Sequence, residues 1–194
     1  KSTGVEFGLH GNAGPVHLTA SAYRSHFSNF IFQSPTGEVE GGLPVFLFLG
    51  GKASFTGFEA QADMKLGSAL GIDWKGEIQG DYVRATVKDF GPVPFLPPLR
   101  LLGALSGSRG QFDGRIEVEK AFAHNRTAPL ETDTPGYTMF NASLDWHALE
   151  KPALTLSLAA NNLFDVEARR STSQLKDFAP LAGRDIRVTA SFGF

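Results

Sequence analysis

Five histidines are the side chains of this 194-residue sequence best suited to bind a metal, because a neutral imidazole nitrogen is a common metal ligand. None of them has the spacing of a metalloprotease motif such as HExxH. His26 and His124 flank two long predicted connections, where they could contact a metal-containing ligand, although ordinary polar loop residues are the simpler interpretation. The other three are predicted on a polar strand face near short turns, with structural or solvated roles: His10, His17 and His147. We therefore predict no resident metal site.

No residue pattern for covalent or acid–base catalysis is present. Cysteine is absent, which excludes disulfides and thiolate metal sites, and no serine lies in a GxSxG nucleophile elbow. Glu117 and Glu119 share a predicted strand face with Arg115, which is ordinary mixed charge on a polar surface rather than a general acid and base. We expect no catalytic residues, no cofactor and no enzymatic activity.

Composition narrows the class of protein further. The net charge is -2, from 18 basic and 20 acidic residues, so the basic footprint of a nucleic-acid-binding protein is missing. Glycine (22) and phenylalanine (17) are abundant, which is typical of short strands, tight turns and an aromatic surface. No apolar run is long enough for a transmembrane helix. A membrane β-barrel stays possible, because its strands carry apolar residues only at alternate positions.

Alternation of apolar and polar residues recurs along the whole chain and predicts strands. It is clearest at the C-terminus, where Ile186, Val188, Ala190 and Phe192 alternate with polar side chains. Successive strand residues point to opposite faces, so each such strand has one apolar and one polar face. Nine strands are predicted: 3–10, 15–27, 55–66, 69–87, 99–106, 111–122, 136–147, 153–162 and 183–194.

The connections between these strands alternate regularly in length. Short ones are predicted near 11–14, 67–68, 106–110 and 148–152, and long ones at 33–51, 88–98, 124–135 and 164–183. Outer-membrane barrels have short turns on the periplasmic side and long loops outside. Most of the strands reach about 9–12 residues, enough to cross a bilayer when tilted, whereas soluble strands average about five or six. Alternation alone also fits a soluble β-sandwich, but loop asymmetry and strand length favour a transmembrane antiparallel β-barrel.

Motifs near the C-terminus resemble the end of TonB-dependent outer-membrane receptors. These are NNLFD at 161–165, Gly183-Arg184 at the start of the last strand, and the terminal Phe194. Further segments resemble the same family in the family's order: AYRSHFSNFIFQSPTG at 22–37, FTGFEAQADMKL at 55–66, PFLPPLRL at 94–101 and PGYTMFNASLDW at 135–146.

The resemblance implies a function and a set of partners. Receptors of this family have a 22-stranded barrel, an N-terminal plug and a TonB-contacting segment, and they bind cargo at the outer loops and plug apex. It implies TonB-dependent uptake of a metal ion or a metal chelate, such as a ferric siderophore or haem, at the bacterial outer membrane. Outer-membrane lipid, the TonB complex and the barrel-assembly machinery would be partners, with Phe192 and Phe194 as the assembly signal.

The sequence departs from a complete receptor, since the plug, the TonB segment and about half of the strands have no counterpart. Nine is also an odd number, whereas bacterial single-chain barrels have an even number of strands. We therefore expect residues 1–194 to be the C-terminal part of such a barrel, forming a sheet that does not close. The alternatives are a small self-contained outer-membrane barrel, structural or lipid-modifying, and a soluble β-rich binding module.

Overall fold

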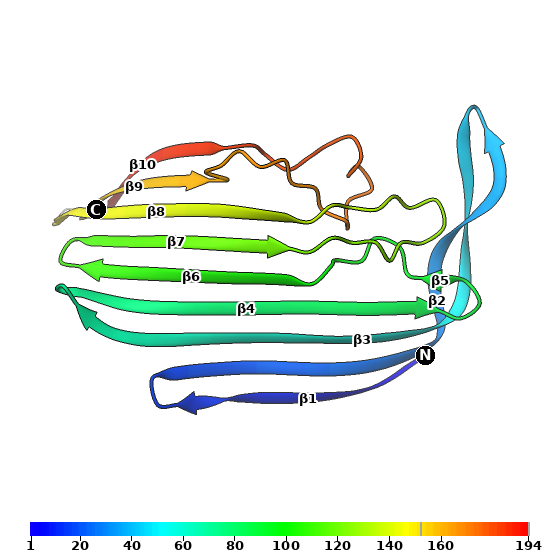
Figure 1. Ribbon diagram of the computed structural model, residues 1–194, viewed down its shortest axis with the longest axis horizontal. Coiled ribbons are helices and arrows are strands. Elements are labelled where there is room, and N and C mark those ends of the chain that lie inside the picture. The colour runs from blue at the N-terminus through cyan, green and yellow to red at the C-terminus, as the bar shows by residue number, and fades with distance from the viewer. Residues whose placement is uncertain (152, 194) are drawn as a thin grey trace.

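The chain folds into one curved antiparallel sheet, shown in Figure 1. The computed structural model describes residues 1–151 and 153–193, so Pro152 and the expected assembly residue Phe194 lie outside it. The strands are β1 (Ser2–Ala13), β2 (Val16–Glu40), β3 (Leu43–Ala69), β4 (Ile72–Val87), β5 (Gly91–Pro92), β6 (Arg100–Arg109), β7 (Phe112–Ala121), β8 (Tyr137–Glu150), β9 (Ala153–Asn161) and β10 (Asp185–Gly193).

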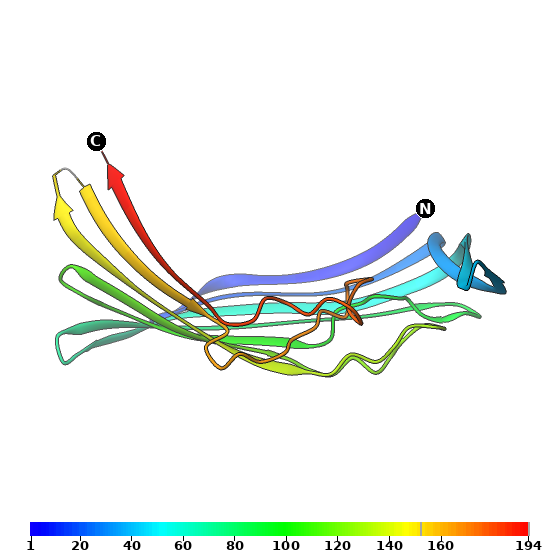
Figure 2. The ribbon, with the colours of Figure 1, turned by 90° about the horizontal axis from the view of Figure 1, so that it is seen from above.

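Each strand pairs with its neighbour in sequence, apart from the two-residue β5, which pairs only with the end of β4. The nine predicted strands are all found, and β5 adds a short tenth. β1 and β10 are the two edges of the sheet, which curves like part of a barrel wall without closing (Figure 2). The expected all-β, incomplete barrel is confirmed.

The strand register separates the apolar and polar faces. Leu158 of β9 lies opposite Leu144 of β8 and Val188 of β10, and directly paired residues share a face. The segment after β9 runs along the concave side of the sheet (Figure 2), and its Ala168 packs against Ala121 and Tyr137, which belong to the polar register. The polar register therefore forms the concave face, and the apolar register forms the convex face.

The predicted long loop at 33–51 is wrong. β2 and β3 continue through this region as a paired hairpin that projects beyond the sheet and turns at Gly41 and Gly42 (Figure 1). Both glycines have positive φ (57° and 84°), as a tight hairpin turn requires. The projecting arm has no buried face, and Phe48 is 73% exposed. The arm therefore lacks the alternation that marks a half-buried strand, and its Pro and Gly residues suggested a loop.

The short connection predicted at 67–68 lies three residues further on, at Leu70 and Gly71 (φ 58° and 73°). Gly67 (φ 89°) instead forms a β-bulge, where the pairing of β3 with β4 shifts after Lys65. A glycine with positive φ serves a bulge as readily as a turn, so the sequence signal was ambiguous. As a result β4 begins at Ile72, not at residue 69.

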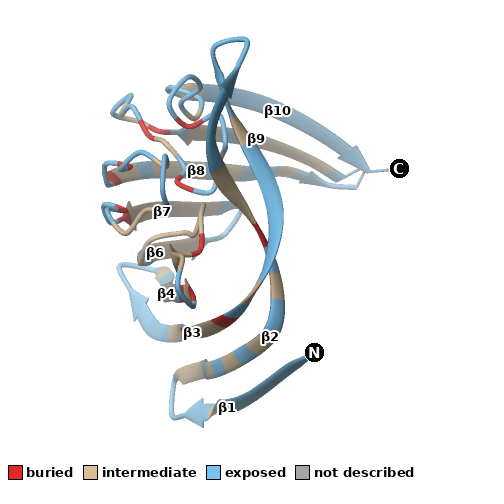
Figure 3. Cartoon of the chain, turned by 90° about the vertical axis from the view of Figure 1, so that its right-hand side faces the viewer, coloured by how far each residue is buried: buried red, intermediate tan, exposed pale blue. Residues whose placement is uncertain are grey.

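The short turns lie at one end of the strands (Figure 1). The long connections 88–99, 122–136 and 162–184 lie at the other end, which we call the loop edge. This agrees with the predicted alternation. Figure 3 shows that buried residues are concentrated at the loop edge, where these connections cover the strand ends. Within residues 1–151 and 153–193, no helix has the length and apolar character needed to cross a membrane.

Candidate functional site

The loop edge holds two small apolar cores that fix the long connections to the sheet. In the first, Val93 of the 88–99 connection packs with Val87 of β4 and with Phe32, which precedes the hairpin arm in β2, at 6%, 1% and 9% exposure. In the second, Ala168 packs against Ala121 and Tyr137. The loops are thus held in place on the barrel wall, and the candidate site is the surface that they build there.

One carboxylate joins the three connections. The side chain of Glu131 is 2% exposed. Its Oε1 accepts a hydrogen bond from the Phe95 backbone N–H (3.1 Å) and lies 3.7 Å from the Lys176 ammonium. Its Oε2 accepts the Ala128 backbone N–H (3.0 Å). Glu131 therefore contacts the 88–99, 122–136 and 162–184 connections at once.

Lys176 is the cationic partner in this group, and it is 3% exposed. Its ammonium donates to the Thr132 carbonyl and to Thr134 Oγ1, the latter at 2.9 Å. The adjacent Asp177 accepts from Thr132 Oγ1 at 2.8 Å. A buried charge is costly unless it is paired and hydrogen-bonded, so removing either ion leaves the other unsatisfied. We call Phe95, Ala128, Glu131, Thr132, Thr134 and Lys176 the loop cluster.

Neither Glu131 nor Lys176 stands out in the sequence as a functional residue. Their residue types and spacing are those of ordinary polar loops. Apart from the Ala128 contact of Glu131, three residues away, the side-chain contacts described above join positions 36 to 45 residues apart. No local pattern encodes such contacts, so only the folded chain reveals them.

The two predicted cargo-contact histidines lie in different surroundings. His124 is 8% exposed, its backbone pairs with Thr134, and its Nε2 has no hydrogen-bond partner within the part of the chain that the structure describes. His26 lies in the convex register of β2, opposite Thr3 and Ser54. The fold does not bring the two together, and cargo contact by either stays a prediction. Across residues 1–151 and 153–193, no three His, Cys, Asp or Glu side chains form a metal-binding group.

We expect the loop cluster to loosen on acidification because of His124. Burial is the main cause that lowers the pKa of His124, and the positive charges of Lys176 and Arg126 lower it further. The carboxylates of Glu131 and Asp133 act in the opposite direction, but the pKa stays below its usual value. The folded loops then bind this proton less well than unfolded ones, so their stability falls as pH drops below about 6.5 and is retained above it. Hydrogen exchange of the 122–136 amides, corrected for intrinsic rates, checks this at pH 7.5 and 5.5. His124→Gln should flatten the pH dependence, and an unchanged dependence in that variant would contradict the assignment.

A second junction closes the base of the 162–184 connection, and it consists of the NNLFD motif. Asn162 is 1% exposed. Its Oδ1 accepts the Val166 N–H (2.9 Å), and its Nδ2 donates to the carbonyls of Val166 (2.9 Å) and Ala182 (3.3 Å). Its own N–H donates to Asn141 Oδ1 of β8 (2.9 Å). One side chain thus holds the two ends of the connection together.

Asp165 of the same motif contacts the Gly183-Arg184 pair. Its Oδ1 accepts the Arg184 backbone N–H at 2.8 Å, and a Cβ placed on Gly183 would lie 2.7 Å from that oxygen. Asn162 and Asp165 have positive φ (49° and 54°), which Asn and Asp tolerate better than most residues. NNLFD and Gly183-Arg184, two of the motifs that resemble the receptor family, therefore form two halves of one contact.

Asn162→Ala should release the base of this connection. It leaves two backbone groups of Val166 and one of Ala182 without their partner, and each such hydrogen bond contributes about 0.5–1.5 kcal/mol to stability. We expect proteolysis within 164–183 to become about tenfold faster, which corresponds to roughly 1.4 kcal/mol. Asn161→Ala is the matched control, because that exposed side chain makes a single 3.5 Å contact, to Asp185. Equal cleavage of the two variants would contradict the role given to Asn162.

The concave face carries paired charges, as the sequence predicted for Arg115, Glu117 and Glu119. Arg115 bridges Glu117 (2.9 Å) and Glu77 (3.0 Å), and Tyr137 donates to Glu119 (2.9 Å). These carboxylates are held by partners, which suits a structured polar wall. The remaining histidines also lie in this register near the short turns, and each contacts a polar neighbour: His10, His17 and His147.

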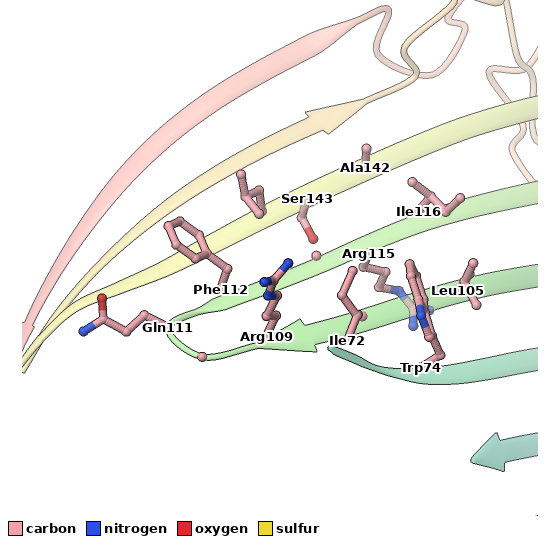
Figure 4. Close-up of a pocket in the computed structure, with 14 residues that line it drawn as sticks. Ile72, Trp74, Leu105, Arg109, Gln111, Phe112, Arg115, Ile116, Ala142 and Ser143 are labelled. Carbon is pink, nitrogen blue, oxygen red and sulfur yellow. The ribbon is translucent and has the colours of Figure 1, made fainter. Parts of the chain in front are cut away.

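The convex face is apolar and is hollowed near the short turns. A hollow of about 830 Å³ lies among Ile72, Trp74, Leu105, Phe112 and Ile116, whose side chains are drawn in Figure 4. Gly107 and Gly114 lie among its lining residues. A Cβ on Gly107 would lie 2.8 Å from the Ile72 side chain. A continuous apolar surface of this extent is unusual on a protein face that meets water, and it marks an interaction surface.

Comparison with known proteins agrees with this architecture. Residues 1–163 match the family model described as TonB dependent receptor-like, beta-barrel, whereas comparison with curated proteins gives no match. The copper transporter OprC aligns with 100% of this chain at a TM-score of 0.87 and 20% identity, over 32% of its own length. The FrpB iron transporter from Neisseria meningitidis aligns with 96% of the chain (TM-score 0.72, 15% identity, 29% of FrpB). The ferric citrate transporter FecA aligns with 98% (TM-score 0.73, 19% identity, 31% of FecA). The chain spans about a third of the length of each.

Proposed function

This chain belongs to the TonB-dependent receptor β-barrel family, and from that premise we propose that residues 1–194 are the C-terminal part of an outer-membrane receptor that imports a metal ion or metal chelate. The family match over residues 1–163 carries the proposal. Solved relatives of similar fold include transporters of copper, iron and ferric citrate, which supports this class of cargo. Uptake driven through TonB, with no catalytic step, is part of the same proposal.

In this proposal the convex face meets lipid. Trp74 and Tyr82 lie at the two ends of the apolar stretch of β4, eight residues apart. Eight residues span about 26 Å along a strand, or about 20 Å across the bilayer at a tilt near 40°. The stacked pair Phe112 and Trp146, with ring centroids 6.1 Å apart, occupies the short-turn end. Aromatic residues at both ends of an apolar band are expected of a membrane barrel.

The concave face would line the lumen and contact the plug that the resemblance implies. The loop cluster would form part of the outer surface where cargo arrives, with His26 and His124 still the predicted cargo contacts. Phe192, in the convex register opposite Leu154, together with Phe194 would serve recognition by the barrel-assembly machinery. A self-contained small barrel has less support, because such a barrel would have β1 and β10 paired and these are the two edges of the sheet.

Metal uptake by the full-length protein tests the proposal. Expressed in a Gram-negative strain without its own metal receptors, the protein should restore uptake of one labelled cargo among copper, ferric citrate, ferric catechol chelates and haem. Deletion of TonB or addition of a proton uncoupler should abolish that uptake. Uptake that persists without TonB, or none of these cargoes entering, would contradict the proposal.

A further inference from the structure

Basic side chains gather on the convex face at the loop edge, directly above an aromatic pair. Phe58 of β3 and Tyr82 of β4 lie opposite each other, with ring centroids 6.1 Å apart. One step further along the strands, Arg24 of β2 lies opposite Thr56 of β3, and Thr56 lies opposite Arg84 of β4. Two arginines therefore follow immediately after the aromatic end of the apolar band.

Further polar rows continue towards the loops in the same register. His26, Ser54 and Thr86 form the next row across β2, β3 and β4. Lys52 and Lys88 follow, with the Lys88 N–H donating to the Lys52 carbonyl at 2.8 Å. These side chains border a hollow of about 540 Å³, with hydroxyl groups among its lining residues. We call Arg24, His26, Lys52, Arg84 and Lys88 the basic rim.

No carboxylate shares this face in the sheet portion of β1 to β4. The acidic residues there all lie in the concave register: Glu6, Glu59, Asp63, Asp73, Glu77 and Asp81. Among the described residues, no Asp or Glu oxygen lies within 4.0 Å of the charged nitrogens of the basic rim. In the sheet portion of β1 to β4, the convex face therefore carries positive charges only, whereas the negative charges lie on the concave face.

Arg126 of the 122–136 connection and Lys120, in the convex register of β7, add further cations. Arg126 donates to the Ala85 carbonyl (2.7 Å) and to Thr86 Oγ1 (2.6 Å), which places it next to the basic rim. Burial and the adjacent Arg84 both lower the pKa of Arg126. Lys120 of β7 lies over the Phe122 ring at 5.8 Å. Like charges gathered without a counter-charge repel one another, and a bound anion would relieve this repulsion.

We propose that the basic rim binds the phosphate groups of a phosphorylated lipid of the outer leaflet, whose acyl chains lie on the apolar convex face below. The proposal rests on the proposed function, because it requires this edge of the sheet to be the outer end of a membrane barrel. Arginine and lysine beside hydroxyl donors are well suited to phosphate oxygens. Apolar surface begins at Phe58 and Tyr82, one step below Arg24 and Arg84, so one amphiphilic molecule contacts both.

Binding to lipid nanodiscs tests this with full-length receptor. The comparison is between phosphatidylcholine with 10% diphosphoryl lipid A and phosphatidylcholine alone, and native mass spectrometry counts the lipid A retained. We expect wild-type receptor to retain lipid A, and Lys52→Gln/Arg84→Gln to weaken retention by about tenfold to thirtyfold, since each basic residue near a charged membrane surface contributes about 1 kcal/mol. Lys65→Gln/Lys75→Gln is the matched control, which removes the same charge from the same two strands on the concave face.

Three outcomes would overturn the proposal: no preference of the wild type for lipid A, equal retention by the two double variants, or displacement of the lipid by millimolar inorganic phosphate, which would indicate a free-anion site. Cargo uptake measured on the same variants separates this proposal from the receptor function. Intact uptake with no lipid preference refutes only the lipid site. Specific lipid retention without TonB-dependent uptake refutes only the proposed cargo function.

Discussion

Replacing Glu131 with alanine is expected to detach the three long connections from one another while the barrel strands stay paired. The substitution leaves the Lys176 ammonium buried beside two threonines, and it removes the acceptor of the Phe95 and Ala128 N–H groups. Breaking a buried ion pair by deleting one partner costs about 3–5 kcal/mol. Hydrogen exchange should therefore accelerate throughout 88–99, 122–136 and 162–184, with little change in β6 to β8.

The neighbouring Asp133→Ala is the matched control for this variant. This substitution removes the same charge from the same connection. The Asp133 carboxylate accepts only one long side-chain hydrogen bond among the described residues, from Thr127 Oγ1 at 3.5 Å. Its exchange pattern should stay close to that of the wild type. If the receptor proposal holds, Glu131→Ala should also weaken cargo binding, because the outer surface loses its fixed shape. Loop protection that is unchanged in Glu131→Ala would show that Glu131 does not join the loops.

Leu158→Arg is the second substitution with a large expected effect, and it acts on the membrane rather than on the loops. Leu158 lies opposite Leu144, which is between the aromatic residues Phe140 and Trp146 on β8, so it is near the middle of the apolar band. Arginine facing lipid at that depth costs about 2–4 kcal/mol. The free energy of unfolding of the full-length receptor, measured in bilayers, should fall by that amount. Less protein should then assemble in the outer membrane.

The adjacent Ser157→Arg separates the two faces of the same strand. Ser157 lies in the concave register and donates to Asp145 of β8, so an arginine there gains a carboxylate and polar surroundings. Assembly of this variant should approach the wild-type level. If Ser157→Arg were instead the more damaging change, the faces would be reversed, since a shift of one residue moves every side chain to the opposite face.

The sequence by itself determined the sheet and its faces. Alternation from Ile186 to Phe192 and in the other strands is a local property, because each half-buried strand must present apolar residues at every second position whatever it pairs with. The order of long and short connections also follows from the chain alone. These features were sufficient to predict nine strands in a sheet that does not close. The receptor family was indicated instead by the resemblance of motifs such as NNLFD and Gly183-Arg184.

Tertiary structure decided the features that depend on surroundings. The hairpin arm at 33–51 was missed because it is exposed on both sides and so shows no alternation, and Gly67 was read as a turn because turns and bulges use the same backbone conformation. Nothing in the sequence indicated the group around Glu131 and Lys176, or that the acidic residues in the sheet portion of β1 to β4 all lie on the concave face. Each of these depends on which distant residues the folded sheet brings together. Local pattern fixes how a strand presents its side chains, whereas burial and charge pairing are set by neighbours that only the fold supplies.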